Sequence, residues 1–142
     1  MLTRHGQAHW EGGLRQGSGR IRLGNGAFDA PYSFSSRFEE QPGSNPEELI
    51  GAAHAACFSM ALAGVLEKAG HAPARIDTSA RVALRPESGG FVIGRVELTT
   101  EGKVPGLEED AFRKAAEQAK RNCPVSKALA GVEIRVKATL LS

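Results

Sequence analysis

The residues with the clearest potential for chemistry are two cysteines, Cys57 and Cys123, the only ones in a chain of 142 residues. Cys57 lies inside NPEELIGAAHAACFSMAL, residues 45–62, whose pattern predicts a helix over nearly its whole length. A cysteine in the middle of a helix gains little from the helix dipole, and burial among apolar groups raises its pKa and leaves it inert. To act as a nucleophile, Cys57 therefore needs a cation close to its sulfur.

Cys123 stands in a different setting, within RNCPVSKAL at residues 121–129. It is predicted at the N-cap of a short helix, after the basic pair Lys120 and Arg121. Free amides and positive charge there favour a thiolate, or at least an accessible thiol, while the plainer interpretation is a small residue tolerated at a cap. In thiol peroxidases a first thiolate attacks the O–O bond and becomes a sulfenic acid, which a second cysteine converts to a disulfide. The sequence permits this pairing without demonstrating it.

His54 offers other chemistry, because it lies one helical turn before Cys57 on the same face. It could act as a base or bind a metal with Cys57, but a packing histidine satisfied by one hydrogen bond is the more frequent case. A zinc site needs four ligands, and the remaining histidines, His5, His9 and His71, are scattered, so no metal site is predicted. A cysteine hydrolase is disfavoured because the amides around Cys57 are engaged inside the helix and cannot form an oxyanion hole.

Composition limits the function classes. The formal net charge is +2 and no block of Lys and Arg stands out, which argues against a nucleic-acid partner. The N-terminus, MLTRHGQAHW, lacks the apolar run of a signal peptide, and AACFSMALAGVL is too short and too rich in Ser and Gly to cross a bilayer. With 41% hydrophobic and 24% charged residues, we expect one globular domain over residues 1–142, cytoplasmic and without a membrane partner. A structural disulfide is unusual in that compartment.

The pattern predicts an α+β fold with the element order βββ-α-ββ-αα-β. Three short strands, with a turn at Asn25-Gly26, are expected at 7–13, 19–26 and 32–39. The helices are expected at 46–68, 107–121 and 125–129, and the later strands at 76–84, 91–100 and 133–140. Asn45, Pro46 and Glu48 are typical of a helix start, and Gly70 of a helix end.

The helix predicted at 46–68 is unusual, because GAAHAACFSMALAG, residues 51–64, carries almost no charge. A helix that is apolar all round is buried on all sides. One small sheet covers only one side, so a second chain is expected to cover the other. We infer an intertwined homodimer in which antiparallel-rich sheets enclose the two central helices.

Together these segments resemble the osmotically inducible protein C / organic hydroperoxide resistance (OsmC/Ohr) family. NPEELIGAAHAACFSMAL followed much later by CPVS is similar to its two-cysteine pattern, and GQAHWEGG, SRFEE, IDTSARVAL and VPGL resemble its OsmC branch, over essentially the whole chain. The resemblance implies an antioxidant, cysteine-based peroxidase that reduces organic hydroperoxides as an intertwined homodimer. It also implies an external dithiol as reductant, such as dihydrolipoamide or a lipoylated protein, rather than a bound cofactor.

By the same resemblance, Cys57 is the peroxidatic cysteine and Cys123 the resolving one, with the family's arginine at Arg37 and its glutamate at Glu47. A guanidinium beside Cys57 would stabilise the thiolate and orient the peroxide, and a carboxylate would hold that guanidinium bidentately. Glu47 lies ten residues before Cys57, however, which is roughly 15 Å along a straight helix. Either the helix bends near Gly51, or the arginine reaches along it, or the partner chain supplies Glu47. We expect an active site built at the dimer interface.

Two interpretations of the apolar residues remain open. Most large apolar side chains are expected in the core, and some of them in the wall of a pocket that favours organic hydroperoxides over hydrogen peroxide: Phe34, Phe38, Phe58, Phe91 and Met60. The alternative to a peroxidase is a non-catalytic binding module that holds a hydrophobic ligand in the dimer pocket. Such a module would keep its function in Cys57→Ser.

Overall fold

The structure is a computed structural model that describes residues 1–141. The chain divides into two compact units, one ending at Leu49 and the other beginning at Ile50. The first unit holds the Arg and Glu of the predicted site, and the second holds both cysteines. Each unit is described by itself.

The first unit is built on an antiparallel sheet of three strands in the order β1-β2-β3. The strands and the short helix after them are β1 (Gly6–Glu11), β2 (Ser18–Leu23), β3 (Asp29–Tyr32) and α1 (Phe34–Phe38). The predicted turn between the second and third strands is confirmed. Gly26 has a φ of 88°, which favours glycine, and Asn25 Oδ1 accepts a hydrogen bond from the Ala27 amide.

The third strand predicted at 32–39 is wrong in its position, because the strand ends at Tyr32 and residues 34–38 form α1. The reason lies in two serines. Ser33 Oγ accepts from the Ser36 amide, and Ser36 Oγ accepts from the Ser33 amide, which is a reciprocal capping box. The alternation of apolar and polar residues in YSFSSRFE suggested a strand, but local side-chain bonds start a helix there and place Arg37 on it.

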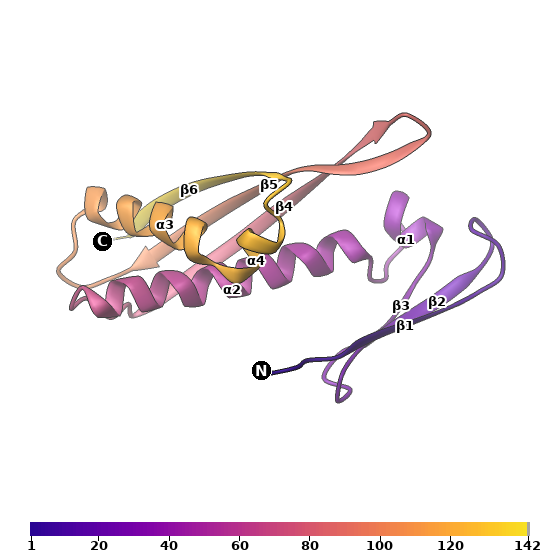
Figure 1. Cartoon of the computed structure of the whole chain (residues 1–142), viewed down its shortest axis with the longest axis horizontal. Helices are drawn as coiled ribbons and strands as arrows, with labels where there is room; N and C mark the ends of the chain where they lie inside the picture. Colours follow the sequence, from indigo (N-terminus) through magenta and orange to yellow (C-terminus); the bar gives the residue numbers. More distant parts are fainter. Residues whose placement is uncertain (142) are drawn as a thin grey trace. The chain divides into compact units, whose positions relative to one another are not determined.

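In the second unit, helices lie against a mixed sheet of three strands in the order β4-β5-β6. Its elements are α2 (Pro46–Lys68, which starts at the end of the first unit), β4 (Arg75–Glu87), β5 (Gly90–Lys103), α3 (Glu109–Asn122), α4 (Pro124–Ala128) and β6 (Glu133–Leu141). β4 and β5 form an antiparallel hairpin, whereas β5 and β6 run parallel and are joined through α3 and α4. Figure 1 shows α2 running along this sheet beside α3 and α4. Apart from the additional helix α1, the predicted α+β element order is confirmed.

Both ends of α2 follow the sequence signals. Asn45 Oδ1 accepts a hydrogen bond of 2.8 Å from the Glu48 amide, and Pro46 occupies the first turn, where its missing N–H costs nothing. Gly70, with a φ of 87°, follows the C-terminal end. The helix is assigned without interruption from Pro46 to Lys68, so it carries both Glu47 and Cys57.

The core of the second unit is formed where α2 and α3 meet the sheet. Its fully buried members include Phe58, Leu62 and Leu66 of α2, Val96 and Leu98 of β5, and Phe112, Ala116 and Ala119 of α3. The Phe112 ring fills the space above Gly102 of β5, where an added Cβ would come within 2.5 Å of ring atoms. Phe112 thus fixes how closely α3 approaches the sheet.

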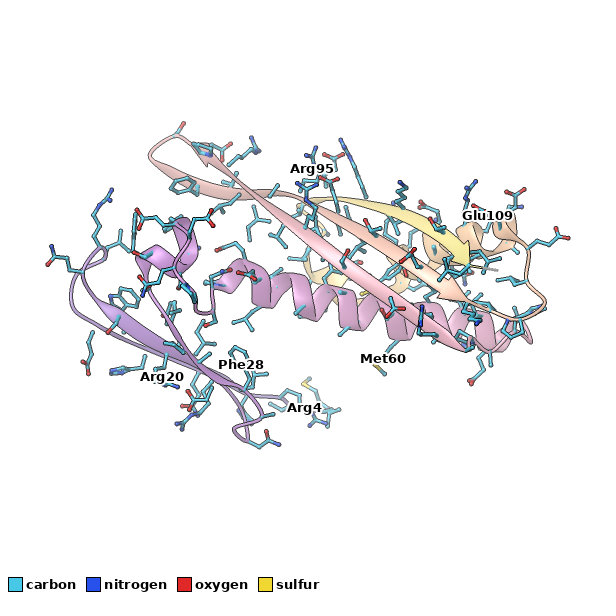
Figure 2. The ribbon with its side chains drawn as sticks, turned by 180° about the vertical axis from the view of Figure 1, so that it is seen from behind. Arg4, Arg20, Phe28, Met60, Arg95 and Glu109 are labelled. Carbon is cyan, nitrogen blue, oxygen red and sulfur yellow. The ribbon has the colours of Figure 1, made fainter. Side chains whose placement is uncertain are left out.

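The opposite face of α2 is apolar and exposed in the single chain, which agrees with the expectation that one small sheet covers only one side of this helix. The stripe consists of Ala52, Ala53, Ala56, Met60 and Gly64. Met60 is 78% exposed and projects away from the β4-β5-β6 sheet (Figure 2). By length and composition alone α2 is able to cross a membrane, contrary to our expectation for its shorter apolar segment, but such a test is also passed by core helices of soluble proteins.

Candidate active site

The two predicted catalytic cysteines lie together in the second unit as free thiols. Cys57 is partly buried in the middle of α2, and Cys123 is fully buried between the end of α3 and the start of α4. The two thiols are close enough for each to shift the pKa of the other. Helix packing thus brings two cysteines that are far apart in the sequence into direct contact.

The surroundings of the pair set opposite pKa shifts. Burial and the hydrogen bond to Cys123 raise the pKa of Cys57 above its ordinary value. Burial alone would raise the pKa of Cys123 too, but donors from Cys57, Ser126 and Val125 outweigh burial and lower it. In this arrangement Cys123 gives up its proton more readily than Cys57 does. The raised pKa of Cys57 and the lowered pKa of Cys123 have the directions that the sequence predicts, although the Cys123 side chain is not accessible. The reactivity of Cys57 stays a prediction.

His54 lies beside this pair and is fully buried. Its Nε2 atom is 2.8 Å from Oγ of Ser126, the third residue of α4. Burial lowers the pKa of His54 below its ordinary value, so the ring is neutral at physiological pH. The prediction of a packing histidine with one hydrogen bond is confirmed. Sequence reasoning missed Ser126, because its contact with His54 arises only when α4 packs against α2.

Arg37 and Glu47 form a bidentate ion pair within the first unit. Arg37 Nε donates to Glu47 Oε1 at 2.9 Å, and Nη2 donates to Oε2 at 2.8 Å. The Glu47 side chain is 11% exposed and that of Arg37 36%, so water competes little for the carboxylate. The hydrogen bonds to Glu47 raise the pKa of Arg37, and the guanidinium stays charged at any relevant pH. One chain therefore supplies both members of this pair.

An aromatic hollow of about 230 Å³ adjoins Arg37 in the first unit. It is lined by Trp10, Leu14, Tyr32, Ser33, Phe34, Arg37 and Phe38. The Arg37 guanidinium lies over the Phe38 ring, 5.0 Å from its centroid, which combines a cation with an apolar wall. Phe34 and Phe38 thus line a pocket as expected. Phe58 is core, whereas Phe91 and Met60 are exposed, contrary to the prediction for these two.

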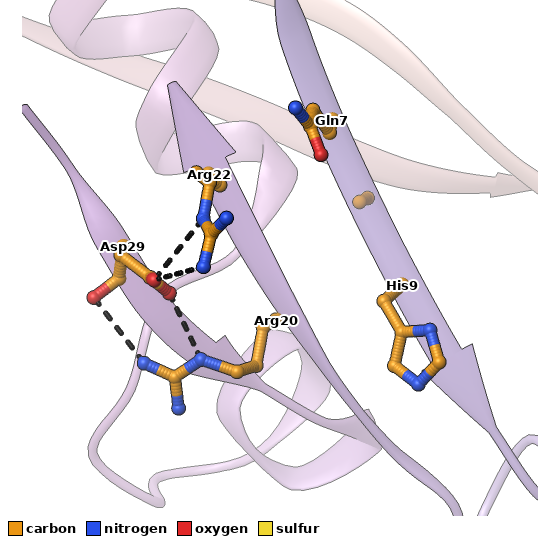
Figure 3. A pocket seen from close by; sticks show the side chains of 6 residues that line it. Gln7, His9, Arg20, Arg22 and Asp29 are labelled. Atoms are coloured by element: carbon orange, nitrogen blue, oxygen red, sulfur yellow. Dashed lines mark hydrogen bonds and ion pairs between the residues drawn. The ribbon is translucent and has the colours of Figure 1, made fainter. Parts of the chain in front are cut away.

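A second hollow lies on the exposed face of the first sheet and has a different character. Figure 3 shows Arg20 and Arg22 converging on Asp29, with Gln7 and His9 on the neighbouring strand. Hydrogen bonds from Arg20 and Arg22 lower the pKa of Asp29, so the carboxylate partly offsets their charge. None of the predicted site residues lines it. Within residues 1–141, no three His, Cys, Asp or Glu side chains gather as metal ligands would.

Comparison with known proteins gives consistent results. The family model described as OsmC-like protein matches residues 39–137. The chain is 48% identical over 129 residues to peroxiredoxin OsmC of Escherichia coli K12, an alignment that covers 90% of both chains. It is 30% identical over 123 residues to the organic hydroperoxide resistance protein OhrB of Bacillus subtilis, covering 84% of this chain and 88% of that one.

Solved structures show the same fold. The crystal structure of OhrB from Bacillus subtilis superposes with a TM-score of 0.70 at 26% identity, covering 99% of this chain and 98% of that one. The element order, the two cysteines in contact and these similarities agree with one another.

Proposed function

The chain belongs to the family of OsmC-like proteins and is a cysteine-based peroxidase of the peroxiredoxin type, and we propose that it reduces organic hydroperoxides through Cys57 and Cys123. The observation that carries this proposal is that the two free thiols lie close together in the folded chain. A pair in contact when reduced needs only a small movement to form a disulfide. The high identity to a peroxiredoxin supports the reaction class.

In the first step the Cys57 thiolate attacks the distal oxygen of the hydroperoxide. An S–O bond forms as the O–O bond breaks, leaving a sulfenic acid on Cys57 and an alkoxide that takes up a proton to become the alcohol. Because burial raises the pKa of Cys57, this step needs a cation that moves negative charge onto its sulfur. Arg37, always charged and held by Glu47, is the residue that fits this role.

In the second step Cys123 attacks the sulfenic acid of Cys57, and the disulfide forms with release of water. An external dithiol then reduces the disulfide by thiol–disulfide exchange and returns both thiols. Dihydrolipoamide or a lipoylated protein has the required chemistry, since its two thiols close a ring as they are oxidised. No bound cofactor is needed for either step, because the electrons come from thiols.

We place the complete site at the interface of a homodimer. Glu47 and Cys57 share α2 but stand ten residues apart, roughly 15 Å on an α-helix. A guanidinium tied to Glu47 is therefore poorly suited to serve Cys57 of its own helix. An antiparallel partner helix brings the Arg37–Glu47 pair of one chain to the middle of α2 in the other. The exposed apolar stripe of α2 supports such a contact.

The aromatic hollow beside Arg37 supports a preference for organic hydroperoxides. Its wall of aromatic rings offers apolar area to an alkyl or aryl group, while the guanidinium at its margin binds the peroxide oxygens. Hydrogen peroxide has no group to place there and gains none of this binding. We expect cumene hydroperoxide to oxidise Cys57 faster than hydrogen peroxide, and equal second-order rates for the two would contradict this assignment.

The proposed function is tested by peroxide consumption with dihydrolipoamide as reductant. Wild type should turn over cumene hydroperoxide repeatedly, and Cys57→Ser should lose turnover completely because the attacking thiolate is gone. Cys123→Ser should lose most turnover with dithiol but still react once. If Cys57→Ser consumed peroxide at the wild-type rate, the protein would instead be a module that binds hydrophobic ligands without using its cysteines.

A further inference from the structure

The Arg37–Glu47 ion pair connects two elements of the first unit, α1 and the first turn of α2. The Arg37 side chain is 36% exposed, and an ion pair with that much contact with water contributes little to holding two elements together. The loop at residues 39–45 joins them and includes Gly43, whose backbone φ of 148° favours glycine. Other contacts must therefore fix α1 against the start of α2.

The side chain of Asn45 supplies such a contact, and this residue is only 5% exposed. Its Nδ2 donates to the carbonyl oxygen of Ser36 in α1 at 3.2 Å, and also to Glu48 Oε1. Its Oδ1 accepts from the Glu48 amide at 2.8 Å and so caps α2. This orientation of the amide group gives each of these partners the donor or acceptor that it needs. One buried side chain thus bonds the residue before Arg37 to the helix that carries Glu47.

Ser36 holds the same loop from the side of α1, and it is 7% exposed. Its carbonyl lies near the end of a helix of five residues, where carbonyls lack helical partners, so the bond from Asn45 satisfies a group otherwise left unpaired. Its hydroxyl donates to the Ser44 carbonyl at 2.8 Å. The loop backbone passes so close that a Cβ added at Gly43 would lie 3.1 Å from Ser36 Cβ. The loop is therefore packed against α1 directly before Asn45.

We propose that Asn45 and Ser36 are positioning residues for the first step, because they hold Arg37 and Glu47 at the separation that the bidentate ion pair requires. Arg37 follows Ser36 directly, and Glu47 lies two residues after Asn45, so the buried bonds fix the backbone at both ends of the ion pair. A guanidinium held in one plane is preorganised for the charge that develops on a peroxide. The catalytic meaning of this clamp of Asn45 and Ser36 rests on the proposed function, whereas its hold on Arg37 does not.

Asn45 also caps α2, and substitutions separate its two roles. Asn45→Ser keeps an oxygen that caps a helix about as well as asparagine does, but it has no amide to donate to Ser36. Asn45→Ala removes both the cap and the donor. Ser36→Ala removes the hydroxyl that bonds the loop. Its matched control is Ser35→Ala, since the Ser35 hydroxyl is also on α1 but bonds an exposed carboxylate outside the clamp.

The first test follows the Arg37 Nε–H proton by nuclear magnetic resonance, assigned by its loss in Arg37→Lys. This group donates to Glu47 at 2.9 Å, so exchange of its proton with water reports how often the ion pair opens. Asn45→Ser and Ser36→Ala should each speed that exchange about fivefold, the usual effect of losing one hydrogen bond, and Ser35→Ala should exchange like wild type. The urea midpoint should fall further in Asn45→Ala than in Asn45→Ser, because only the alanine variant loses the cap.

Wild-type exchange in both Asn45→Ser and Ser36→Ala would overturn the proposal and leave Asn45 as a cap alone. Faster exchange in Asn45→Ala but not in Asn45→Ser would overturn the role of the amide in the same way. Should Asn45→Ser not fold, Ser36→Ala against Ser35→Ala decides the question.

The second test is a double-mutant cycle on the oxidation of Cys57 by cumene hydroperoxide. Asn45→Ser should lower the second-order rate about fivefold in the wild-type background. In Arg37→Met the same substitution should change the rate by less than about twofold, because Asn45 acts through the guanidinium. An equal loss in both backgrounds would overturn the proposal. A wild type that does not react with hydroperoxide contradicts the proposed function, while proton exchange at Arg37 still judges the clamp.

Discussion

The Arg37 guanidinium is held on two nitrogens by the two oxygens of Glu47, and its remaining donors are left for a ligand. This fork-to-fork geometry fixes the plane of the guanidinium as well as its position. A lysine could supply the charge but not the plane, because its ammonium is a point charge on a flexible stem. The role that we propose for Arg37 therefore depends on geometry as much as on charge.

We expect Arg37→Met to lower the rate of Cys57 oxidation by roughly 10²–10³, the usual cost of removing a donor to developing negative charge. Arg37→Lys should recover only part of that loss. Glu47→Gln should cost about tenfold, because the amide holds the guanidinium more weakly than the carboxylate does. Rapid-mixing kinetics with cumene hydroperoxide measure these rates. Arg22→Met, which removes an exposed arginine paired with Asp29, serves as control and should react like wild type.

Residue types in the sequence were enough to single out Cys57 and Cys123 and to foresee that His54 packs with one hydrogen bond. Arg37 and Glu47 came from the family resemblance alone, since an isolated arginine after a strand-like run looks like a surface charge. The structure shows that these two form an ion pair, but their catalytic roles stay predictions. Ser126 could not be found in advance, because its contact with His54 depends on how α4 packs against α2.

At the scale of elements, α3 packs closely against the sheet where the Phe112 ring lies over Gly102. Gly102 of β5 leaves room for the Phe112 ring, and a methyl group at Gly102 would overlap ring atoms of a fully buried side chain. We expect Gly102→Ala to lower the free energy of unfolding by about 1–3 kcal/mol through overpacking. Gly131→Ala, at a position with open space around its Cβ, is the matched control. Equal denaturant midpoints for the two variants would contradict this packing.

The packing of α2 also predicts a pH dependence. Burial lowers the pKa of His54 below its ordinary value of 6.5, so the unfolded chain binds this proton more readily than the folded chain. Stability contributed by His54 is therefore present above about pH 6.5 and is lost as the pH falls below it. His54→Gln should lose less stability than wild type between about pH 7.5 and pH 5.5. Urea midpoints at fixed protein concentration measure this, and an identical loss in both proteins would speak against a neutral buried ring.

Element types were largely predictable, because caps and periodicity act locally. As expected, α2 begins at Pro46 after the cap residue Asn45 and ends shortly before Gly70. α1 was missed because the capping box of Ser33 and Ser36 was not recognised and the alternation of YSFSSRFE was given more weight. β4 and β5 also extend beyond the expected strands, since their pairing continues into residues whose own pattern does not favour a strand.

At the scale of the whole molecule, the apolar stripe of α2 stands out because no part of the single chain covers it among residues 1–141. The sequence foresaw the lack of a charged face, and in the single chain that face is uncovered. The dimer that would cover it, the single-domain description and the cytoplasmic location stay predictions. They concern a second chain, the relation of two units and a compartment, which local patterns do not determine.

We expect Met60→Lys to weaken dimerisation by roughly a hundredfold or more, because an ammonium would be buried there without a partner. Activity should fall with it, since Cys57 would lose the Arg37–Glu47 pair of the other chain. Met60→Leu keeps the volume and apolar character and should behave like wild type. Light scattering and turnover on the same samples provide the measurement. Fully active monomers would show that the site does not need a second chain.

The most direct test of the central claim is the intact mass of the reduced protein after one equivalent of cumene hydroperoxide. Wild type should lose two hydrogens, Cys123→Ser should gain one oxygen as a trappable sulfenic acid, and Cys57→Ser should stay unchanged on the same time scale. This pattern would assign attack to Cys57 and resolution to Cys123. An unchanged mass in wild type, or an added oxygen on Cys123 in Cys57→Ser at the wild-type rate, would contradict it.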